Sequence, residues 1–508
     1  MDGDNHPVCI NPVVHFFTMQ ALSTLILIDK DSLQPVYLQI ANQLMVFIKD
    51  GNLQAGHRLP STRQMSDWLQ VHRKTVIQAY DELLAQGWLE SRTGSGTYVA
   101  KHLPEIHPRS LLNGATKPIN PAHVAGFEFD AVPHLDKPAI LSKHKYHLDD
   151  GFPDSRLAPL EELARAYRSQ LLTGNPYVRL GYGDTMGSLW LRQVLADYLN
   201  DTRGLKVTAD NILITRGTVM GLYLSCTAFL QPGDIAVVGE LNYNGANMNF
   251  LQAGTKLLKI PVDEHGIVVE ALADICRKQR VRMVYVTSHH FYPTTTALRA
   301  DRRIELLRLA EQFGFIIFED DYDYDFHYLS KPLLPLASAD KAGMVLYCGS
   351  FTKSISPAFR VGYLVASENV IRHLAQLRRI IDRQGDNMLE NAIAELLQNG
   401  IIQRYLRKSM RTYRQRRDVF CELLKDNLSE YIQFQVPVGG MAVWSHFPPE
   451  IDLNVLAQKA VKHDLFFSPG FRNEEISPVL NATRLGFASS TPEELEECVA
   501  ILKKVLTS

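Results

Sequence analysis

The sequence contains few cysteines, and none of them forms a recognisable pair. Six cysteines are spread over 508 residues, with no Cys-x-x-Cys motif. This spacing excludes a disulfide framework and offers no metal site, and it is typical of a protein kept reduced in the cytoplasm.

An excess of charge of either sign is also lacking. Fifty-three Lys and Arg against 55 Asp and Glu give a net charge of −2. Any surface that binds nucleic acid must therefore be local. Hydrophobic residues make up 46% and charged residues 21%, which excludes wholesale disorder, collagen and coiled coil. At roughly 100–200 residues per domain, the length predicts two to four domains.

Long apolar runs are absent as well. No stretch approaches the roughly 18 uninterrupted apolar residues of a membrane span, so no membrane partner is expected. Residues 1–30 carry Asp2 and Asp4 where a signal peptide needs basic residues, and are interpreted as an N-terminal extension. Two starts remain open: Met1, or Met19 if the first residues lie upstream of the true start.

Residues 31–100 have the pattern of three short helices and a hairpin, which predicts a winged helix-turn-helix domain. A first amphipathic helix ends at Gly51, Pro60-Ser61 opens a second, and a third begins near Arg73. The sequence WLESRTGSGTYVA then alternates around Gly94 and Gly96, as in a hairpin with a glycine tip. The residues expected to face the core are Ile40, Leu44, Phe47, Ile48, Met65, Trp68, Leu69, Val76, Tyr80, Leu83 and Leu84.

Residues 101–147 are rich in proline and have little periodicity, which predicts an extended linker. Residues 148–508 instead have the pattern of an α/β domain. Apolar segments such as IAVVGE, VRMVYVT, FIIFEDD, MVLYCGS and VGYLVAS alternate with helical stretches such as RRIELLRLAEQFG. This alternation predicts a mainly parallel sheet covered on both faces.

The segment LPSTRQMSDWLQVHRKTVIQAYDELLAQGWLESRTGSGTYV places cations and a hydroxyl at the starts of two helices. It resembles the GntR-type winged helix, whose pattern is LPS-x-R, V-[ST]-R-x-T-V and EGxLxxRxGSGTYV. Side chains at the start of a recognition helix reach base edges, where arginine commonly reads guanine, while Lys and Thr hold phosphates. The expected DNA-binding residues are Arg63, Arg73, Lys74 and Thr75, with Gly94 and Gly96 letting the wing approach the minor groove.

Two features qualify this resemblance. His72 stands where the family usually has Ser or Thr, a departure that bears on helix capping and on one phosphate contact. Residues 31–100 contain six Lys or Arg and six Asp or Glu, so the prediction of duplex DNA as a partner rests on placement and family pattern. The alternative is a winged helix that binds another protein.

A second group of motifs begins at GSFTKSISPAFRVGYLV. Lys353 follows a strand and turn, and Arg360 lies seven residues further on, as in the Schiff-base segment of fold-type I pyridoxal-phosphate enzymes, which this segment resembles. That chemistry needs a lysine amine against an aldehyde, a hydroxyl and a guanidinium on the phosphate, and an anion against the ring nitrogen.

Two other interpretations of this region fail. The S-x-x-K motif of penicillin-binding enzymes needs S-D-N and K-T-G partners, which are not found in suitable positions. The run Asp321, Asp323 and Asp325 is similar to a calcium loop, but Phe326 and Pro332 stand where an EF-hand needs Gly and Glu.

The other aminotransferase segments follow in the family's order, and the resemblance implies a role for each. Tyr182 in LGYGDTMG would reach the phosphate of the neighbouring subunit of a homodimer. Gly217, Thr218 and Val219 begin a helix whose free N–H groups suit a phosphate. Further cofactor contacts are implied for Tyr243 (ring stacking), Asp320 (ring nitrogen), Tyr322 (ring hydroxyl), and Ser350 with Arg360 (phosphate). Arg484 would clamp a substrate or effector carboxylate.

A winged helix joined to an aminotransferase-like domain is the architecture of the MocR regulators, the group that includes GabR-like proteins. The resemblance covers residues 31–508 apart from the linker, with a small subdomain from about residue 386 to residue 508. Tyr292 stands where aminotransferases usually have Asn, and His290 is a candidate substitute in cofactor binding. Gly245 replaces the arginine of γ-aminobutyrate-binding relatives, so that effector is not supported.

The resemblance implies a cytoplasmic, pyridoxal-phosphate-dependent transcription regulator that senses an amine, an amino acid or the cofactor itself. The main alternative is a working aminotransferase with a DNA-binding appendage, because Lys353 and its partners are all present. A third interpretation is an interaction scaffold with a vacant cofactor pocket.

Overall fold

The computed structural model describes residues 25–32, 34–103, 125–135, 143–329, 333–473 and 480–508. The chain divides into two compact units, residues 1–128 and 129–508. The boundary between them falls inside the segment predicted as a linker. Within the described residues, no helix is long and apolar enough to cross a membrane, and the five described cysteines are free and buried.

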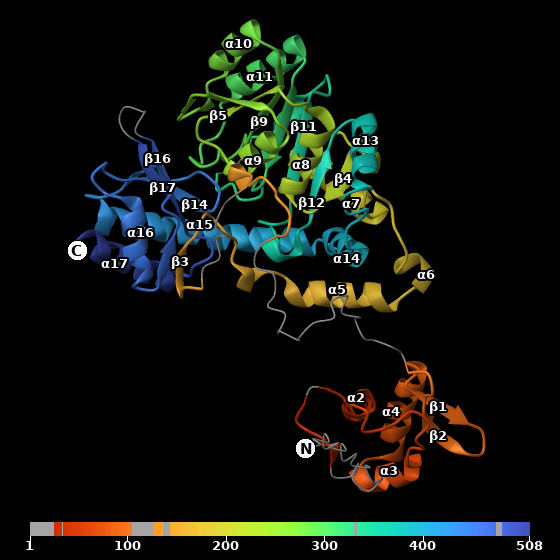
Figure 1. Ribbon diagram of the computed structural model, residues 1–508. Coiled ribbons are helices and arrows are strands. Elements are labelled where there is room, and N and C mark those ends of the chain that lie inside the picture. Colours follow the sequence, from red (N-terminus) through yellow and green to blue (C-terminus); the bar gives the residue numbers. More distant parts are fainter. Residues whose placement is uncertain (1–24, 33, 104–124, 136–142, 330–332, 474–479) are drawn as a thin grey trace, which may run out of the picture. The chain divides into compact units, whose positions relative to one another are not determined.

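The smaller unit has the predicted three helices and hairpin (Figure 1). The helices are α2 (Val36–Lys49), α3 (Thr62–Leu69) and α4 (Arg73–Ala85), and the antiparallel wing pairs β1 (Leu89–Arg92) with β2 (Gly96–Val99). Most of the expected core residues are buried, while Phe47, Trp68 and Leu84 are half-buried at its edge.

Both helices of the helix-turn-helix begin at a residue that caps them. Ser61 and Gln64 form a reciprocal capping box at the start of α3. At the start of α4, His72 Nδ1 accepts a hydrogen bond of 3.2 Å from the Lys74 backbone N–H. The substitution of His for Ser or Thr therefore keeps the cap, through a ring nitrogen in place of a hydroxyl.

The larger unit is built on a seven-stranded sheet in the order β4-β12-β11-β10-β9-β5-β6. All neighbouring strands are parallel except β12, which runs antiparallel to β11 and β4. The strands are β4 (Ile212–Thr215), β5 (Ile235–Gly239), β6 (Lys256–Ile260), β9 (Val281–Val286), β10 (Ile316–Asp321), β11 (Val345–Ser350) and β12 (Gly362–Val365). Five of them are the apolar segments singled out in the sequence, so the expected α/β fold is confirmed.

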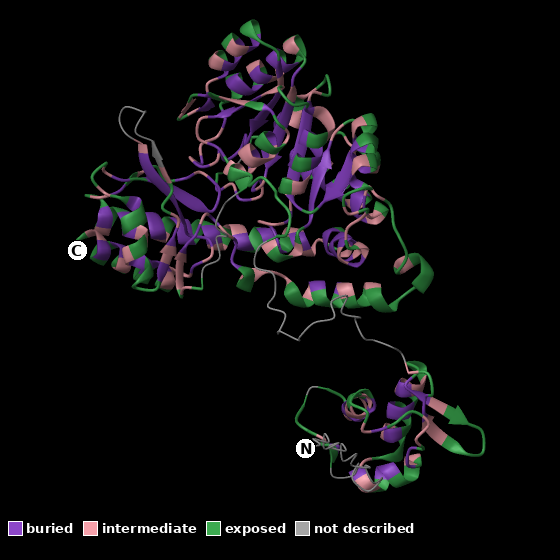
Figure 2. Ribbon diagram, in the orientation of Figure 1, coloured by how far each residue is buried: buried purple, intermediate pink, exposed green. Residues whose placement is uncertain are grey.

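Helices cover both faces of this sheet, and strand residues alternate between two cores (Figure 2). Val237 belongs to the core on the face covered by α7 (Leu189–Arg203), α10 (Val269–Lys278) and α11 (Ala300–Phe313). Its neighbours Ala236 and Val238 pack on the other face with α8 (Thr218–Phe229), α9 (Asn244–Gln252) and α13 (Glu368–Arg378). A strand that is buried on both faces is a continuous run of apolar residues, which explains why these strands could be recognised in the sequence.

The C-terminal part forms a second, smaller layer within the same unit. Its antiparallel sheet has the order β13-β14-β17-β16. These strands are β13 (Gln433–Phe434), β14 (Ala442–His446), β16 (Phe471–Asn473) and β17 (Leu480–Gly486), and the helices are α14 (Asn387–Gln398), α15 (Ile401–Leu428), α16 (Leu453–Val461) and α17 (Pro492–Leu506).

The chain enters this layer before the large sheet begins. Strand β3 (Tyr146–Leu148) pairs in parallel with β15 (Leu465–Phe467), across more than 300 residues of sequence. Tyr146 and His147, the last residues of the predicted linker, therefore already belong to the folded unit. The remaining elements are α5 (Leu160–Leu172), α6 (Pro176–Arg179), α12 (Leu336–Ala339), and the hairpin β7 (Val262–Asp263) and β8 (Gly266–Ile267).

Candidate functional site

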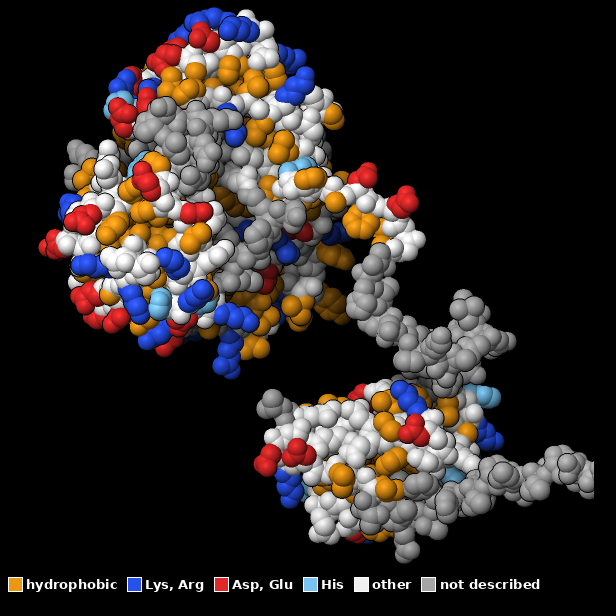
Figure 3. All heavy atoms as spheres, turned by 60° about the vertical axis from the view of Figure 1, so that its left-hand side comes forward, with side chains coloured by type: hydrophobic (Ala, Val, Ile, Leu, Met, Phe, Trp, Pro, Cys, Tyr) orange, Lys and Arg blue, Asp and Glu red, His pale blue; other side chains and the backbone are white. Residues whose placement is uncertain are grey.

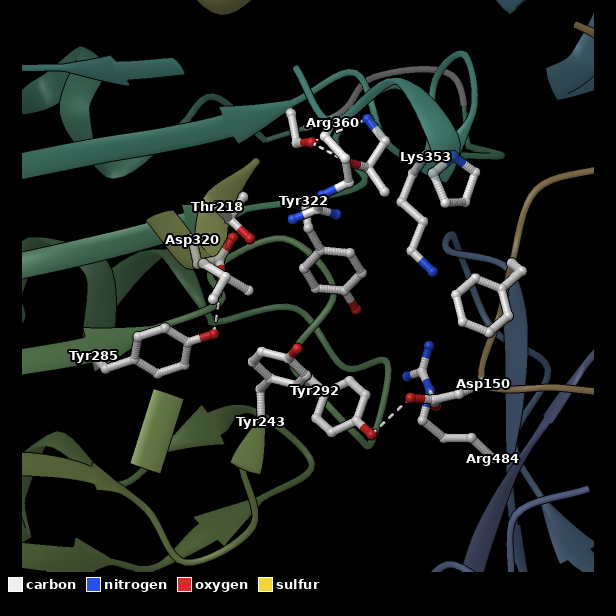
Figure 4. Close-up of a pocket in the computed structure, with 15 residues that line it drawn as sticks. Asp150, Thr218, Tyr243, Tyr285, Tyr292, Asp320, Tyr322, Lys353, Arg360 and Arg484 are labelled. Atoms are coloured by element: carbon white, nitrogen blue, oxygen red, sulfur yellow. Dashed lines mark hydrogen bonds and ion pairs between the residues drawn. The ribbon is translucent and has the colours of Figure 1, made fainter. Parts of the chain in front are cut away.

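A cavity of about 270 Å³ lies where strands β10 and β11 end, at the edge that faces the C-terminal layer (Figure 4). Ligand sites of open α/β sheets lie outside the carboxyl ends of the strands, and this position follows that rule. The lining residues are Asp150, Phe152, Thr218, Val219, Tyr243, Tyr285, Tyr292, Asp320, Tyr322, Ser350, Thr352, Lys353, Pro357, Arg360 and Arg484.

Lys353 projects into the middle of this cavity from the turn that follows β11 (Figure 4). Its Nζ donates a hydrogen bond of 2.5 Å to the Gly151 carbonyl oxygen and lies 4.5 Å from the centre of the Phe152 ring. Burial lowers the pKa of Lys353 below its usual value, although Asp150 and Asp149 act against this shift. A lowered pKa favours the neutral amine, which is the protonation state that attacks a carbonyl carbon.

Asp320, near the end of β10, is a buried carboxylate with one free oxygen. Its Oδ2 accepts a hydrogen bond of 3.0 Å from the Tyr285 hydroxyl, while Oδ1 is buried without a hydrogen-bond partner. Burial raises the pKa of Asp320 to about 7, against the bond from Tyr285, which lowers it. A protonated ring nitrogen opposite Oδ1 would supply the missing donor and favour the ionised carboxylate, so the residues present fit a pyridine cofactor.

One wall of the cavity is suited to an anion. Gly217 precedes α8 with φ +79°, and a Cβ there would lie 2.8 Å from Arg360 Nη2, so only glycine fits without a shift. This close approach brings the free N–H groups at the start of α8, including those of Thr218 and Val219, next to the Arg360 guanidinium. Helix dipole, backbone donors and a cation together favour a phosphate.

Ser350 belongs to the same wall. Its hydroxyl donates to Thr352 Oγ1 at 2.7 Å and accepts from the Thr352 backbone N–H at 3.0 Å. These bonds order the turn between β11 and Lys353.

Three tyrosines border the opposite side of the cavity. Tyr243, at the start of α9, packs edge-on against Tyr292 with ring centres 5.6 Å apart. Tyr322 follows β10, and its hydroxyl donates to the His290 carbonyl oxygen at 3.0 Å. The hydroxyl of Tyr292 donates to Asp150 Oδ2 at 2.8 Å.

Arg484 lies on β17 and reaches the cavity from the C-terminal layer. Its Nη1 donates to the Pro293 carbonyl oxygen at 2.8 Å, and its Nε lies 2.7 Å from Asp150 Oδ1 in a close ion pair. Burial lowers the pKa of Arg484, but nearby Tyr322 and Asp150 outweigh this effect, so its pKa lies above the usual value. The guanidinium is fully charged and already paired.

Three of the predicted cofactor residues lie outside the cavity lining: Gly217, which directly precedes the lining residue Thr218, and His290 and Tyr182. His290 is buried, where its Nδ1 lies 2.8 Å from Asp323 Oδ1 and its ring stacks on His327 at 5.8 Å. Tyr182 is 78% exposed, with the Arg383 guanidinium 3.9 Å above its ring. The remaining predicted residues meet at this one cavity.

Sequence reasoning missed Asp150, Phe152, Tyr285, Thr352 and Pro357. Thr352 and Pro357 lie in the quoted lysine motif and Tyr285 on a quoted strand, but nothing marked them as lining a cavity. For Asp150 and Phe152 the available signal was the Asp-Gly-Phe-Pro turn, which follows the short apolar strand β3.

The predicted DNA-binding residues lie on the surface of the winged-helix unit. Arg63, Arg73 and Lys74 are exposed, Thr75 is half-buried, and Arg73 Nε donates to Thr62 Oγ1 at 3.3 Å. In the wing, Gly94 (φ +75°) and Gly96 (φ +122°) are exposed, and the Arg58 side chain lies against Gly96. Basic and acidic side chains are intermixed on the face drawn in Figure 3.

A lysine, an acidic residue for a ring nitrogen and a phosphate wall at the end of a parallel sheet define a pyridoxal-phosphate site of the aminotransferase type. Comparison with known families agrees: "Aminotransferase class I and II" matches residues 144–502, and "Bacterial regulatory proteins, gntR family" matches residues 36–99. The chain therefore belongs to the class I and II aminotransferase family, within the MocR-type regulators that carry a GntR winged helix.

The similarity extends over nearly the whole chain. A "probable rhizopine catabolism regulatory protein MocR" of Rhizobium meliloti is 29% identical over 94% of this chain and 95% of its own. The "HTH-type transcriptional regulator TauR" of Rhodobacter capsulatus is 29% identical over 90% of this chain and 94% of its own. The solved structure of an α-aminoadipate aminotransferase of Thermus thermophilus is 27% identical, with a TM-score of 0.65 over 71% of this chain and 92% of its own.

These findings confirm the predicted fold-type I architecture, the DNA-binding domain and the pyridoxal-phosphate cofactor. The protein is a MocR-type transcription regulator that binds DNA through its winged helix and holds pyridoxal phosphate in its aminotransferase-like domain. When bound, pyridoxal phosphate supplies an aldehyde that takes up amines.

The position of Lys353 leads to a prediction about cofactor attachment. Replacing Lys353 with Ala should abolish the covalent link that borohydride fixes between cofactor and protein, because Lys353 is the only lysine among the described residues that line the cavity. Peptide mapping after reduction measures this. Lys341→Ala, at an exposed lysine, is the control and should keep the label. A label that persists in Lys353→Ala on another lysine would contradict the assignment.

Proposed function

We propose that the chain senses an amine or amino acid, or the cofactor itself, in this cavity and converts its binding into a change of DNA affinity. The observation that carries the proposal is that Lys353, Asp320 and Arg360 converge on one cavity of a chain that also has a capped, exposed recognition helix. Residues 31–100 would bind DNA, and residues 148–508, with a small subdomain from about 386, would bind the effector. Because its target is DNA, we place it in the cytoplasm.

In this proposal each predicted residue has a role that its surroundings support. Lys353 would hold the cofactor covalently and Asp320 would pair with its ring nitrogen, while Tyr243 would border the ring and Tyr322 would serve the ring hydroxyl. The phosphate-binding residues are Gly217, Thr218, Val219, Ser350 and Arg360. His290 acts as a positioning residue, since its carbonyl oxygen holds the Tyr322 hydroxyl at 3.0 Å and its ring is fixed by Asp323.

A working aminotransferase is the second candidate function, and the lowered pKa of Lys353 favours it. Transamination would require Lys353 to move a proton between the substrate Cα and the cofactor. It would also require the cofactor ring to be held so that the bond that breaks is correctly aligned with it. Tyr292 replaces the asparagine that helps to align the ring in aminotransferases, and its hydroxyl is engaged by Asp150. We therefore expect binding without sustained turnover.

The effector response distinguishes the two functions. Addition of an amine effector should change operator affinity by about 5- to 150-fold, the usual range of coupling between two sites, with no steady release of keto acid or aldehyde. Fluorescence anisotropy with an operator duplex and a carbonyl-release assay on the same preparation measure both. Multiple turnover with unchanged DNA affinity would establish the enzyme. A colourless protein that binds DNA without any amine response would establish the scaffold.

The DNA contacts lead to a separate prediction. If Arg73 reads a guanine, Arg73→Ala should cost about 1–3 kcal/mol on the operator and little on random DNA. If Lys74 contacts only a phosphate, Lys74→Ala should weaken both duplexes alike and lower the salt slope by about 1. Affinities measured at several salt concentrations test this. An equal loss on both duplexes for Arg73→Ala would contradict base reading.

A homodimer is supported by exposed apolar side chains on and near α5 and α6, which are largely exposed in Figure 2. These side chains are Leu160, Leu171, Leu172, Tyr177, Val178, Leu180, Tyr182, Leu189, Ile380 and Ile381. Apolar patches of this kind mark interaction sites in proteins. Since Tyr182 does not line the cavity of its own chain, the proposed occupant is a second copy, whose phosphate site Tyr182 would complete.

Placing a charge in this surface tests the dimer. Val178 is 75% exposed in the single chain, so Val178→Glu should leave the fold intact yet weaken association by roughly 3 kcal/mol or more, because the charge would be buried without a partner. Sedimentation at several concentrations measures this. Ile304→Glu, at a residue 69% exposed on α11, is the matched control and should stay dimeric. A wild-type monomer with full cofactor occupancy would disprove the proposal.

A further inference from the structure

An ion pair lies at the end of the cavity away from Gly217 and Arg360, the wall suited to a phosphate. Figure 4 shows Asp150 and Arg484 facing each other beside Tyr292. Asp150 Oδ1 lies 2.7 Å from Arg484 Nε, an ion pair in which the Nε–H makes no aligned hydrogen bond, and Oδ2 accepts from the Tyr292 hydroxyl at 2.8 Å. Arg484, which was expected to bind a substrate carboxylate, is therefore already paired with a carboxylate of its own chain.

Asp150 is held in this position by the backbone around it. The Asp149 carboxylate accepts from the Phe152 N–H at 2.8 Å and from the Ser489 hydroxyl at 2.9 Å, which fixes the turn. Two residues further on, Asp154 is anchored by Arg416 at 2.8 Å. The Asp150 side chain is 24% exposed and that of Arg484 is 4% exposed, and both line this end of the cavity.

The pair changes what this end of the cavity can recognise. An incoming carboxylate would have to displace Asp150 from Arg484 and then lie beside it, and like charges at such distances repel strongly where water is scarce. A hydroxyl meets no such obstacle, because it can donate to the Asp150 carboxylate and accept from a guanidinium N–H. A second ammonium group gains little, since Arg484 balances the charge of Asp150.

We propose that Asp150 is a specificity-determining residue, and that the cavity takes an amine whose remaining polar group is an uncharged hydroxyl and not a carboxylate. This inference rests on the proposed function, because it names the class of effector for the same cavity. Asp150 sets this preference by occupying Arg484. The amine nitrogen is left to the Lys353 end of the cavity.

Four amines with the same three-carbon chain test the preference: 3-aminopropan-1-ol, 3-aminopropanoate, 1,3-diaminopropane and propylamine. Each is titrated into the cofactor-loaded full-length protein while the absorbance of the bound cofactor is recorded. In the wild type, 3-aminopropan-1-ol should half-saturate at a concentration about tenfold or more below that of 3-aminopropanoate. The half-saturating concentrations of the diamine and of propylamine should be higher than that of 3-aminopropan-1-ol.

The variant Asp150→Asn keeps the size of the side chain and removes its charge, which frees Arg484. The order should then reverse, with 3-aminopropanoate gaining about tenfold or more and 3-aminopropan-1-ol changing by no more than about threefold. Asp263→Asn is the matched control, because Asp263 pairs with Arg302 at 2.6 Å outside the cavity lining, and it should keep the wild-type order. Tyr292→Phe, which removes the hydroxyl that holds Asp150, should shift selectivity toward the carboxylate by a smaller factor.

The possible failures are distinguishable. If 3-aminopropanoate is preferred by the wild type, or if Asp150→Asn leaves the order unchanged, the role of Asp150 is wrong while amine sensing stands. If no amine alters the cofactor absorbance of the wild type, amine recognition in the cavity is itself wrong, and the inference fails with the proposed function. If Asp150→Asn does not retain the cofactor, the Tyr292→Phe titration decides. A shift of selectivity toward 3-aminopropanoate supports the role of Asp150, and unchanged selectivity contradicts it.

Discussion

The site depends on four buried carboxylates on and directly after β10, those of Glu319, Asp320, Asp321 and Asp323, with the half-buried Asp325 beside them. Glu319 accepts from the Ser288 hydroxyl and from the backbone N–H groups of Leu336 and Ala337, and Asp321 contacts His289 and the Tyr347 hydroxyl. Asp323 contacts His290, and Asp325 pairs with Arg203. Asp320 alone has an oxygen that lines the cavity without a partner. A buried charge persists only when it is paired, so each of these partners fixes part of the sheet edge. Asp323 Oδ2 is also buried without a hydrogen-bond partner, but Asp323 does not line the cavity, so the unpaired oxygen of Asp320 marks the place of a cation there.

The same edge shows why the pKa values of neighbouring carboxyl groups diverge. Burial raises the pKa of Glu319 and of Asp320, whereas His289 and Tyr347 bring that of Asp321 below its usual value in spite of burial. Residues 319 and 321 point to one side of the strand and residue 320 to the other, as in any β-strand. Alternation along β10 therefore separates structural carboxylates from the one that faces the cofactor site.

Most of the fold and half of the site could be predicted from sequence because the signals are local. Asp320 lies near the end of a buried strand, and Lys353 and Arg360 follow another at fixed spacing. Strands that are buried on both faces are continuous apolar runs, which are easy to recognise in a sequence. The roles of His290 and Asp150 could not be predicted in this way. His290 is directed away from the cavity by Asp323, 33 residues later, and Asp150 meets Tyr292 across 142 residues. His72 shows the same limit at short range, since its ring nitrogen replaces a hydroxyl as helix cap only in one side-chain orientation.

The origin of the lining residues indicates how a small ligand could act at a distance. Lys353 and Asp320 belong to the large sheet, Arg484 belongs to β17 of the C-terminal layer, and Asp150 lies in the turn after β3, which pairs with β15 of that layer. A ligand bound to Lys353 and in contact with Asp150 therefore touches both layers of the larger unit at once. Binding can shift an arrangement of these layers only if its contacts differ between the two states. A ligand that spans Lys353 and Asp150 provides such a difference, because it can make both contacts only in an arrangement that holds the large sheet and the C-terminal layer at the matching distance.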